Sequence, residues 1–245
     1  MTEAPGHGPE PLPSSGAAPF VRPGIALVVA GAGFIAAFVV TSLYTQLWRP
    51  GLLTAPPAVL ALLDLVIVLA PYCVAIVVAA RWGGGDSGLR GWSPLGIGFG
   101  LSLGVLARGV TELLAPTTGS LTGAFSADAD GTVVAGLVVS AAGAVLVSPL
   151  IEELFFRGVI QRATAQAAGA RGSAFAAVAA VTLSVLAFVA AHLLVADSSA
   201  WPTEIAATLP LGLAAALATA FTRGIGAALV GHVVFNLGGI LLLLA

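Results

Sequence analysis

Long apolar runs, separated by short connectors rich in turn residues, constrain this chain more than any other feature. A helix needs about 20 residues to cross the hydrocarbon core of a bilayer. Runs of that length lie near 24–45, 57–80, 93–115, 132–151, 173–196, 203–221 and 225–245. Only 8% of the 245 residues are charged, whereas a soluble domain carries about a quarter. The sequence therefore predicts an all-α, polytopic membrane helix bundle with about seven transmembrane helices.

The arginines predict how this bundle lies in the membrane. In a seven-span arrangement one side carries Arg22, Arg81, Arg90, Arg162, Arg171 and Arg223. Only Arg49 falls on the other side. Because basic residues are enriched in cytoplasmic loops, the N-terminus is predicted to be cytoplasmic and the C-terminus external. The chain has no lysine and much Ala, Gly, Val and Arg, which indicates a GC-rich bacterial genome and a bacterial cytoplasmic membrane.

Composition predicts the structure of two further segments and excludes one class of partner. Residues 1–23 are rich in Pro, Gly and Ser, and they predict a disordered cytoplasmic tail because they cannot bury enough apolar surface to fold. Residues 24–131 are expected to hold the N-terminal transmembrane helices. The net charge of −2 provides no basic patch, so nucleic acid is excluded as a partner.

Two adjacent glutamates, Glu152 and Glu153, stand out in the apolar surroundings of the fourth run. An ionised carboxylate there is costly unless it is paired, protonated or hydrated. Neighbouring helical residues point about 100° apart, so the two carboxylates cannot serve one site equally. Arg157 follows Glu153 by four residues, the favourable order for a helical ion pair. Glu152 is thereby left as the free carboxylate and as a candidate general base.

Two histidines, His192 and His232, also lie within apolar runs. Glu152 and His192 stand at similar distances from the turn at Arg171, on opposite sides of it, so antiparallel helices would bring them to matched depth. His232 lies closer to its own turn at Arg223. The depths agree if the turn at Arg171 projects beyond the membrane. The spacing thus predicts a site about one-third of the way into the bilayer, open to the cytoplasm.

Three short motifs resemble those of a known family. Residues 152–157 (EELFFR) match its EExxxR motif, residues 188–192 (FVAAH) match FxxxH, and residues 232–236 (HVVFN) match HxxxN. Their order and their positions on predicted spans are similar to those in the CAAX prenyl protease and bacteriocin-processing (CPBP, or Abi) family of intramembrane endopeptidases, of the Ras-converting-enzyme type. The resemblance covers roughly residues 132–240.

The resemblance implies a catalytic transmembrane core in residues 132–245 and an endopeptidase reaction. In such proteins the first glutamate and the second-motif histidine activate a water molecule, which here implies Glu152 and His192. The third-motif histidine and asparagine stabilise the oxyanion, which implies His232 and Asn236. Expected substrates are membrane-associated peptides or proteins, of the prenylated CAAX type or similar to bacteriocins, and the other partner is the lipid bilayer.

The same resemblance implies supporting residues and no cofactor. Glu153 and Arg157 are expected to form an orienting pair, and Phe188 to support the site beside His192. A zinc alternative remains open, because one carboxylate and two imidazoles, from Glu152, His192 and His232, form a known zinc ligand set. Against zinc, the chain has no HExxH pair.

Two other functions remain open. The first is a proton-coupled transporter, in which the membrane carboxylates and imidazoles relay protons, although such transporters usually contain an internal repeat and none is visible. The second is a catalytically silent membrane scaffold, against which the complete motif set argues. Three further charges in apolar runs, Asp64, Arg108 and Glu112, are expected to form structural ion pairs or interhelical hydrogen bonds. Their alternative role is a polar wall of the substrate cavity.

Overall fold

The computed structural model describes residues 18–86, 88–89, 92–121 and 131–245, and Arg90 lies outside these ranges. All regular elements of the described residues are helical, which confirms the predicted fold class. The α-helices are α1 (Pro23–Leu43), α2 (Pro57–Gly83), α3 (Pro94–Leu114), α5 (Thr132–Ala142), α6 (Ser148–Glu152), α7 (Arg162–Ala168), α8 (Ser173–Leu193), α9 (Trp201–Thr222) and α10 (Gly226–Leu244).

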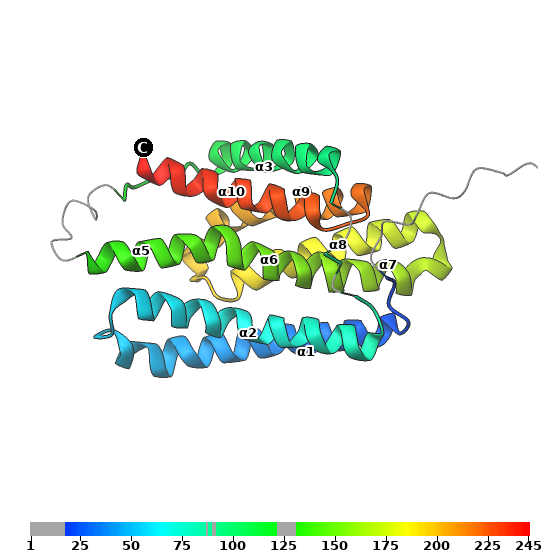
Figure 1. Ribbon diagram of the computed structural model, residues 1–245, viewed down its shortest axis with the longest axis horizontal. Helices are drawn as coiled ribbons and strands as arrows, with labels where there is room; N and C mark the ends of the chain where they lie inside the picture. Colours follow the sequence, from blue (N-terminus) through cyan, green and yellow to red (C-terminus); the bar gives the residue numbers. More distant parts are fainter. Residues whose placement is uncertain (1–17, 87, 90–91, 122–130) are drawn as a thin grey trace, which may run out of the picture.

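Within the described ranges, seven helical runs are long and apolar enough to cross a bilayer, as predicted. They are Pro23–Leu52, Pro57–Gly83, Pro94–Leu114, Thr132–Arg171, Ser173–Leu193, Ser198–Thr222 and Gly226–Leu244. The fourth run is 40 residues long, which corresponds to about 60 Å, twice the hydrocarbon thickness of a bilayer. It extends past the other helices at the α7 end (Figure 1), so the turn at Arg171 projects as expected.

This 40-residue run, here called the central helix, is the core of the bundle. It is continuous through two π-helical segments, Gly143–Val147 and Glu153–Gln161. Figure 1 shows it between the α1–α2 hairpin and the layer of α3 and α10. All nine residues of Glu153–Gln161 are buried, and this segment contacts α1, α2, α8 and α9. Its polar side chains, Glu153, Arg157 and Gln161, therefore need partners inside the bundle.

Helices α3 and α10 approach each other closely because glycine lines their contact. A Cβ atom on Gly104 of α3 would collide with the carbonyl oxygen of Gly231. Gly100, one turn earlier, meets the carbonyl of Ala227 in the same way. Small residues of this kind permit direct backbone contact between membrane helices. The contact fixes the rotation and height of α10 at the residue that precedes His232.

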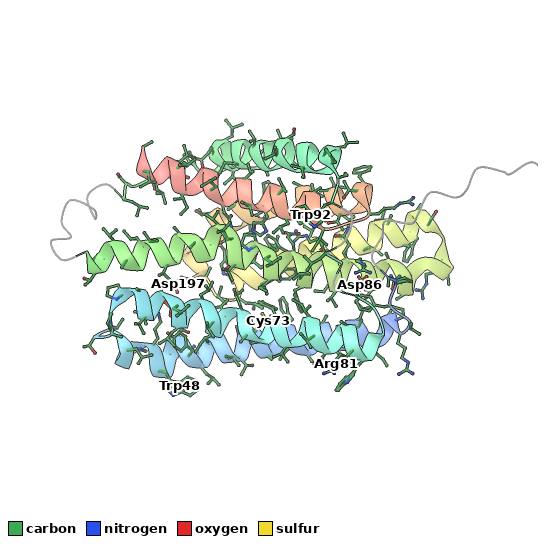
Figure 2. All side chains as sticks on the ribbon, in the orientation of Figure 1. Trp48, Cys73, Arg81, Asp86, Trp92 and Asp197 are labelled. Atoms are coloured by element: carbon green, nitrogen blue, oxygen red, sulfur yellow. The ribbon has the colours of Figure 1, made fainter. Side chains whose placement is uncertain are left out.

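The two ends of the bundle differ in charge. The arginine-rich end carries the described residues Arg22, Arg81, Arg162, Arg171 and Arg223, all near the beginnings or ends of helices. The opposite end carries Arg49, in the short segment after α1. Figure 2 shows Arg81 and Trp48 at these two ends. The separation agrees with the pattern expected from the sequence, and the side of the membrane on which each end lies remains a prediction.

The last residues of the predicted disordered tail are packed against the arginine-rich end. Phe20 is 5% exposed, and its backbone N–H donates to Gln166 at 2.9 Å. The guanidinium of Arg162 donates to the carbonyl of Ala18 at 2.6 Å. The expected disorder therefore does not extend to Ala18–Arg22, because Phe20 supplies the apolar anchor that the tail composition lacks. Residues 1–17 lie outside the described ranges.

The additional charges of the N-terminal helices form ion pairs, as expected. Arg49 bonds both carboxylate oxygens of Asp64, with Nε–Oδ1 at 3.0 Å, and the hydroxyl of Tyr44 donates to the same carboxylate at 2.8 Å. Arg108 and Glu112 pair along α3 at 2.9 Å. All of these groups lie outside the cavity described below, so the polar-wall alternative gains no support.

Candidate active site

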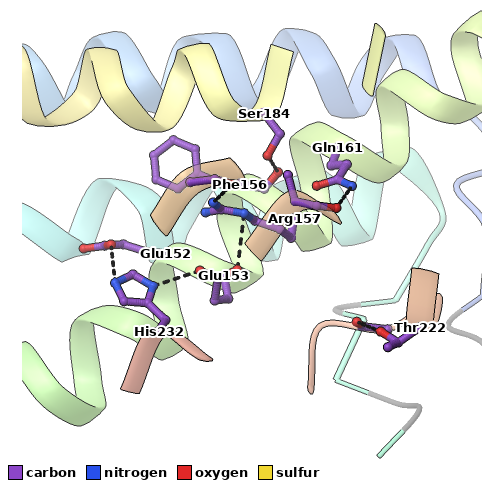
Figure 3. A network of polar contacts seen from close by, with 11 residues as sticks. Glu152, Glu153, Phe156, Arg157, Gln161, Ser184, Thr222 and His232 are labelled. Atoms are coloured by element: carbon purple, nitrogen blue, oxygen red, sulfur yellow. Dashed lines mark hydrogen bonds and ion pairs between the residues drawn. The ribbon is translucent and has the colours of Figure 1, made fainter. Parts of the chain in front are cut away.

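A chain of four ionisable side chains crosses from the central helix to α10 (Figure 3). Arg157 Nε lies 3.3 Å from Glu153 Oε2, and both side chains are fully buried. His232 Nδ1 lies 2.8 Å from Glu153 Oε1. On its other side, His232 Nε2 lies 3.7 Å from Glu152 Oε2. The predicted Glu153–Arg157 pair is present, and His232 joins the two glutamates.

The buried guanidinium of Arg157 is held from several sides. It donates to the carbonyl of Gly212 on α9 at 3.0 Å, and its Cζ lies 4.6 Å from the centre of the Phe188 ring. A buried ion pair is tolerated only when hydrogen bonds and close opposite charge offset the loss of hydration. Arg157 therefore fixes the Glu153 carboxylate, and Glu153 in turn fixes the His232 ring.

The hydrogen bonds define which ring nitrogens face the site. His192 Nδ1 lies 2.9 Å from the Phe188 carbonyl, an acceptor, so this nitrogen carries the proton. His232 Nδ1 faces the ion-paired carboxylate of Glu153 and is the donor there as well. In the neutral tautomers that follow, Nε2 of each ring is the free acceptor. Both imidazoles thus present the nitrogen that can take a proton or, when protonated, donate one.

Phe188 is the packing centre of the site. Its side chain is fully buried, and its ring centre lies 4.6 Å from that of His192 and 5.8 Å from that of His232. The second contact is edge-on, at an interplanar angle of 82°. The Phe188 ring thus packs against both imidazoles and against the guanidinium of Arg157. This placement is consistent with the supporting position expected from the sequence.

Glu152 and His192 face a common cavity of about 120 Å³. A single water molecule needs about 10–15 Å³ of such space, so several fit. The walls come from α1, α2, the central helix and the end of α8; the lining residues are Phe34, Ala37, Phe38, Thr41, Val68, Tyr72, Glu152, Phe156, Ala191, His192, Leu194 and Val195. A carboxylate and an imidazole beside a small, mostly apolar space can activate water there.

The cavity lies near the middle of the helical runs of α1, α2 and the central helix that wall it, and the cytoplasm-facing opening expected from the spacing remains a prediction. Its α1 residues lie in the second half of that helix, and His192, Leu194 and Val195 lie at the end of α8. Both of these regions lie at a distance from the arginine-rich end, since α1 and α8 each begin there. Because α8 begins at the projecting turn, its end reaches only the middle of the neighbouring helices.

Asn236 lies one turn after His232, and its amide is already engaged. Its Nδ2 donates to the carbonyl of Ala144, in the central helix, at 2.7 Å. It is not among the described residues that line the Glu152 cavity. The face shared with His232 agrees with the spacing, and the oxyanion role remains a prediction.

The zinc alternative raised by the sequence remains a prediction. Among the described residues there is no group of three or more His, Cys, Asp or Glu side chains arranged to hold a metal ion. The carboxylate of Glu152 approaches His232, and the Nδ1 atoms of both imidazoles are directed to protein acceptors, so Nε2 is the nitrogen of each ring that could bind a metal.

Three residues near the network were not predicted from the sequence. Gln161 donates to the carbonyl of Ala216 at 2.8 Å, and Ser184 donates to the carbonyl of Phe156 at 3.1 Å. Gln161 follows Glu153 by two helical turns, so its face could have been recognised. Tyr72 is contributed by α2 and packs on Phe155 at 4.6 Å between ring centres. No local pattern could have identified it.

Comparison with known proteins gives one family match. Residues 134–238 match the model of the family described as type II CAAX prenyl endopeptidase Rce1-like. No curated protein and no solved structure matches the chain significantly. The matched segment contains all three motifs and the whole Arg157–Glu153–His232–Glu152 chain, which confirms the resemblance found in the sequence. The match thus supports the family resemblance, and together with the seven membrane-spanning helical runs it indicates an integral membrane protease of the Rce1-like type.

Proposed function

We propose that the protein is a glutamate-dependent intramembrane endopeptidase in which Glu152 and His192 activate a water molecule. The observation that carries the proposal is their common cavity, with His232 held against Glu152 from the side of α10. Glu153 and Arg157 act as the orienting pair. No metal is needed in this proposal, since a carboxylate can serve as the general base.

The proposed reaction is hydrolysis of a peptide bond, with Glu152 transferring a proton from the water to the leaving nitrogen. Glu152 takes a proton from the water, which Nε2 of His192 orients by accepting a hydrogen bond, and the hydroxide oxygen bonds to the carbonyl carbon of the scissile peptide. The oxyanion accepts hydrogen bonds from protonated His232 Nε2 and from the amide of Asn236. Each such donor contributes about 2.7–4 kcal/mol in a site shielded from water. The C–N bond then breaks, and the proton held by Glu152 passes to the leaving nitrogen, which gives a carboxylic acid and an amine.

A groove beside the cavity supports a membrane-associated substrate. It lies between α1 and α8, has a volume of about 560 Å³, and is lined almost entirely by apolar residues. Phe34 belongs to the walls of both the groove and the catalytic cavity. A substrate embedded in the bilayer, such as a prenylated CAAX-type or bacteriocin-like peptide, can approach along this groove without crossing water. Access past Phe34 would bring its peptide bond to Glu152.

The proposed orientation places the arginine-rich end in the cytoplasm of a bacterial cell, because basic residues favour that side. In this orientation the Glu152 cavity lies near the middle of the bundle, since its lining residues from α1, α2 and the central helix fall in the middle of those helical runs. A proton-coupled transporter fits the geometry less well. The ionisable chain ends at Arg157, whose side chain is 0% exposed and is enclosed by Phe156 and Phe188.

The proposal is tested with purified protein and a library of fluorogenic membrane peptides, prenylated and unprenylated. Glu152→Gln should lower kcat by about 10²–10⁴-fold, the usual contribution of a general base, without loss of folding. The control is Glu112→Gln, which changes an acid on α3 outside the cavity. Equal activity in wild type and Glu152→Gln would remove the assignment. Loss of activity after exhaustive chelation, with recovery on adding zinc, would favour the metal alternative.

A further inference from the structure

One backbone carbonyl of the central helix, that of Ala144, has no backbone donor available. Ala144 lies in the π-helical segment Gly143–Val147, and a π-helical turn pairs a carbonyl with the N–H five residues later. The N–H of Ser148 accordingly donates to Gly143. The corresponding donor for Ala144 would be residue 149, which is proline and has no N–H. Because the hydrocarbon core of a bilayer offers no water to bond even an exposed carbonyl, Ala144 requires a donor from another helix.

Asn236 supplies this donor. Its Nδ2 lies 2.7 Å from the Ala144 oxygen and ties α10 to the central helix. The same arrangement occurs in α9, where Pro210 lies inside the helix and lacks the N–H that would pair with Ala206. There Thr111 of α3 donates to the Ala206 carbonyl at 3.2 Å. In both places a proline frees a carbonyl that a side chain on a neighbouring helix then uses.

We propose that Pro149 is a positioning residue for the reaction. By keeping the Ala144 carbonyl open, it holds the amide of Asn236 in place through one N–H. A side-chain amide has two N–H groups, so the second is left to donate to the oxyanion. This inference rests on the proposed function, in which Asn236 is an oxyanion donor.

The physical reason is preorganisation. The terminal torsion of an asparagine is broad, so a free amide samples many orientations. An oxyanion donor is effective when it points at the developing charge before the reaction begins. The Ala144 bond removes that freedom at a position one turn from His232.

The first test uses thermal unfolding and needs no substrate. Pro149→Ala supplies an N–H that can take the Ala144 carbonyl in place of Asn236. In wild type, Asn236→Leu should lower Tm by on the order of 5 °C, since it removes the donor but keeps the shape. In the Pro149→Ala background the same change should have almost no effect. An equal Tm loss in both backgrounds would overturn the inference.

Comparing the two backgrounds is essential because Pro149 is fully buried, and its truncation alone leaves a void. Pro71→Ala is the matched control, since Pro71 also lies inside a helix, α2. In that background Asn236→Leu should lower Tm as much as in wild type. If Pro149→Ala does not fold, the Asn236→Leu variant of the wild-type protein still tests the inference. An unchanged Tm in that variant would contradict the need for a hydrogen bond from Asn236 to the Ala144 carbonyl.

The second test measures steady-state kinetics. Pro149→Ala should lower kcat by about tenfold with KM unchanged, because an oxyanion donor acts in the transition state and not on substrate binding. An unchanged kcat would overturn the positioning role. Wild-type protein that shows the Tm coupling but cleaves no peptide would instead contradict the proposed function, so the two failures are distinguishable.

Discussion

At the scale of single residues, the two adjacent glutamates have different surroundings. Glu153 is completely enclosed between Arg157 and His232, whereas the side chain of Glu152 keeps 15% exposure and faces the cavity. The 100° rotation between neighbours on a helix accounts for this division. Glu153 thus belongs to the interior of the bundle, and Glu152 is available to water.

Removing the Glu153 carboxylate should lower the stability of the folded protein. Glu153→Ala leaves the buried guanidinium of Arg157 without its counter-ion, so we expect a loss of about 3–5 kcal/mol in the free energy of unfolding. Denaturant titration in detergent micelles measures it. The matched control is Glu112→Ala, which breaks the partly exposed pair with Arg108 and should cost about 1 kcal/mol or less. Similar losses in both variants would contradict the structural role of Glu153.

The sequence predicted contacts between these residues only where they lie on the same helix. Glu153 and Arg157 are four positions apart on one helix, so their pairing follows from local geometry. The bond between His232 and Glu153 joins residues separated by 79 positions. The sequence placed His232 in the site but assigned it no partner, because the partner depends on how α10 is rotated against the central helix.

At the scale of elements, the contact of α3 with α10 holds the histidine in place. Gly104→Val should push the helices apart, because the added side chain meets the Gly231 carbonyl. We expect a loss of about 1–3 kcal/mol in the free energy of unfolding, the usual cost of overpacking, and a lower kcat from the displaced His232. Thermal unfolding and peptide cleavage measure the two effects.

The same helix provides the control. Gly109 of α3 has nothing within 4 Å of a Cβ position, so Gly109→Val should leave both folding and kcat close to wild type. A destabilisation as large as that of Gly104→Val would show that valine in α3 acts through helix propensity and not through the contact with α10. Gly100 and Gly104 of α3 lie outside the matched family segment. The sequence alone gave no reason to connect these two glycines with the site.

At the scale of the whole molecule, the charge difference between the two ends predicts the orientation. Thr118, after α3, and Ala170, in the turn before α8, are both exposed and lie at opposite ends. In a Cys73→Ser background, Thr118→Cys should react with a membrane-impermeant maleimide in intact cells, and Ala170→Cys should react only after permeabilisation. The reverse pattern would invert the orientation and place the arginine-rich end outside the cell.

The sequence by itself determined the seven spans, the Glu153–Arg157 pair and the family motifs. These depend on hydrophobic length and on the 3.6-residue repeat, which act within one segment. Only the tertiary structure decided that His232 joins both glutamates, that Asn236 binds the carbonyl freed by Pro149, and that α1 and α2 wall the cavity. Those contacts depend on the rotation and height of each helix relative to its neighbours, which are fixed by side-chain packing between segments far apart in the chain.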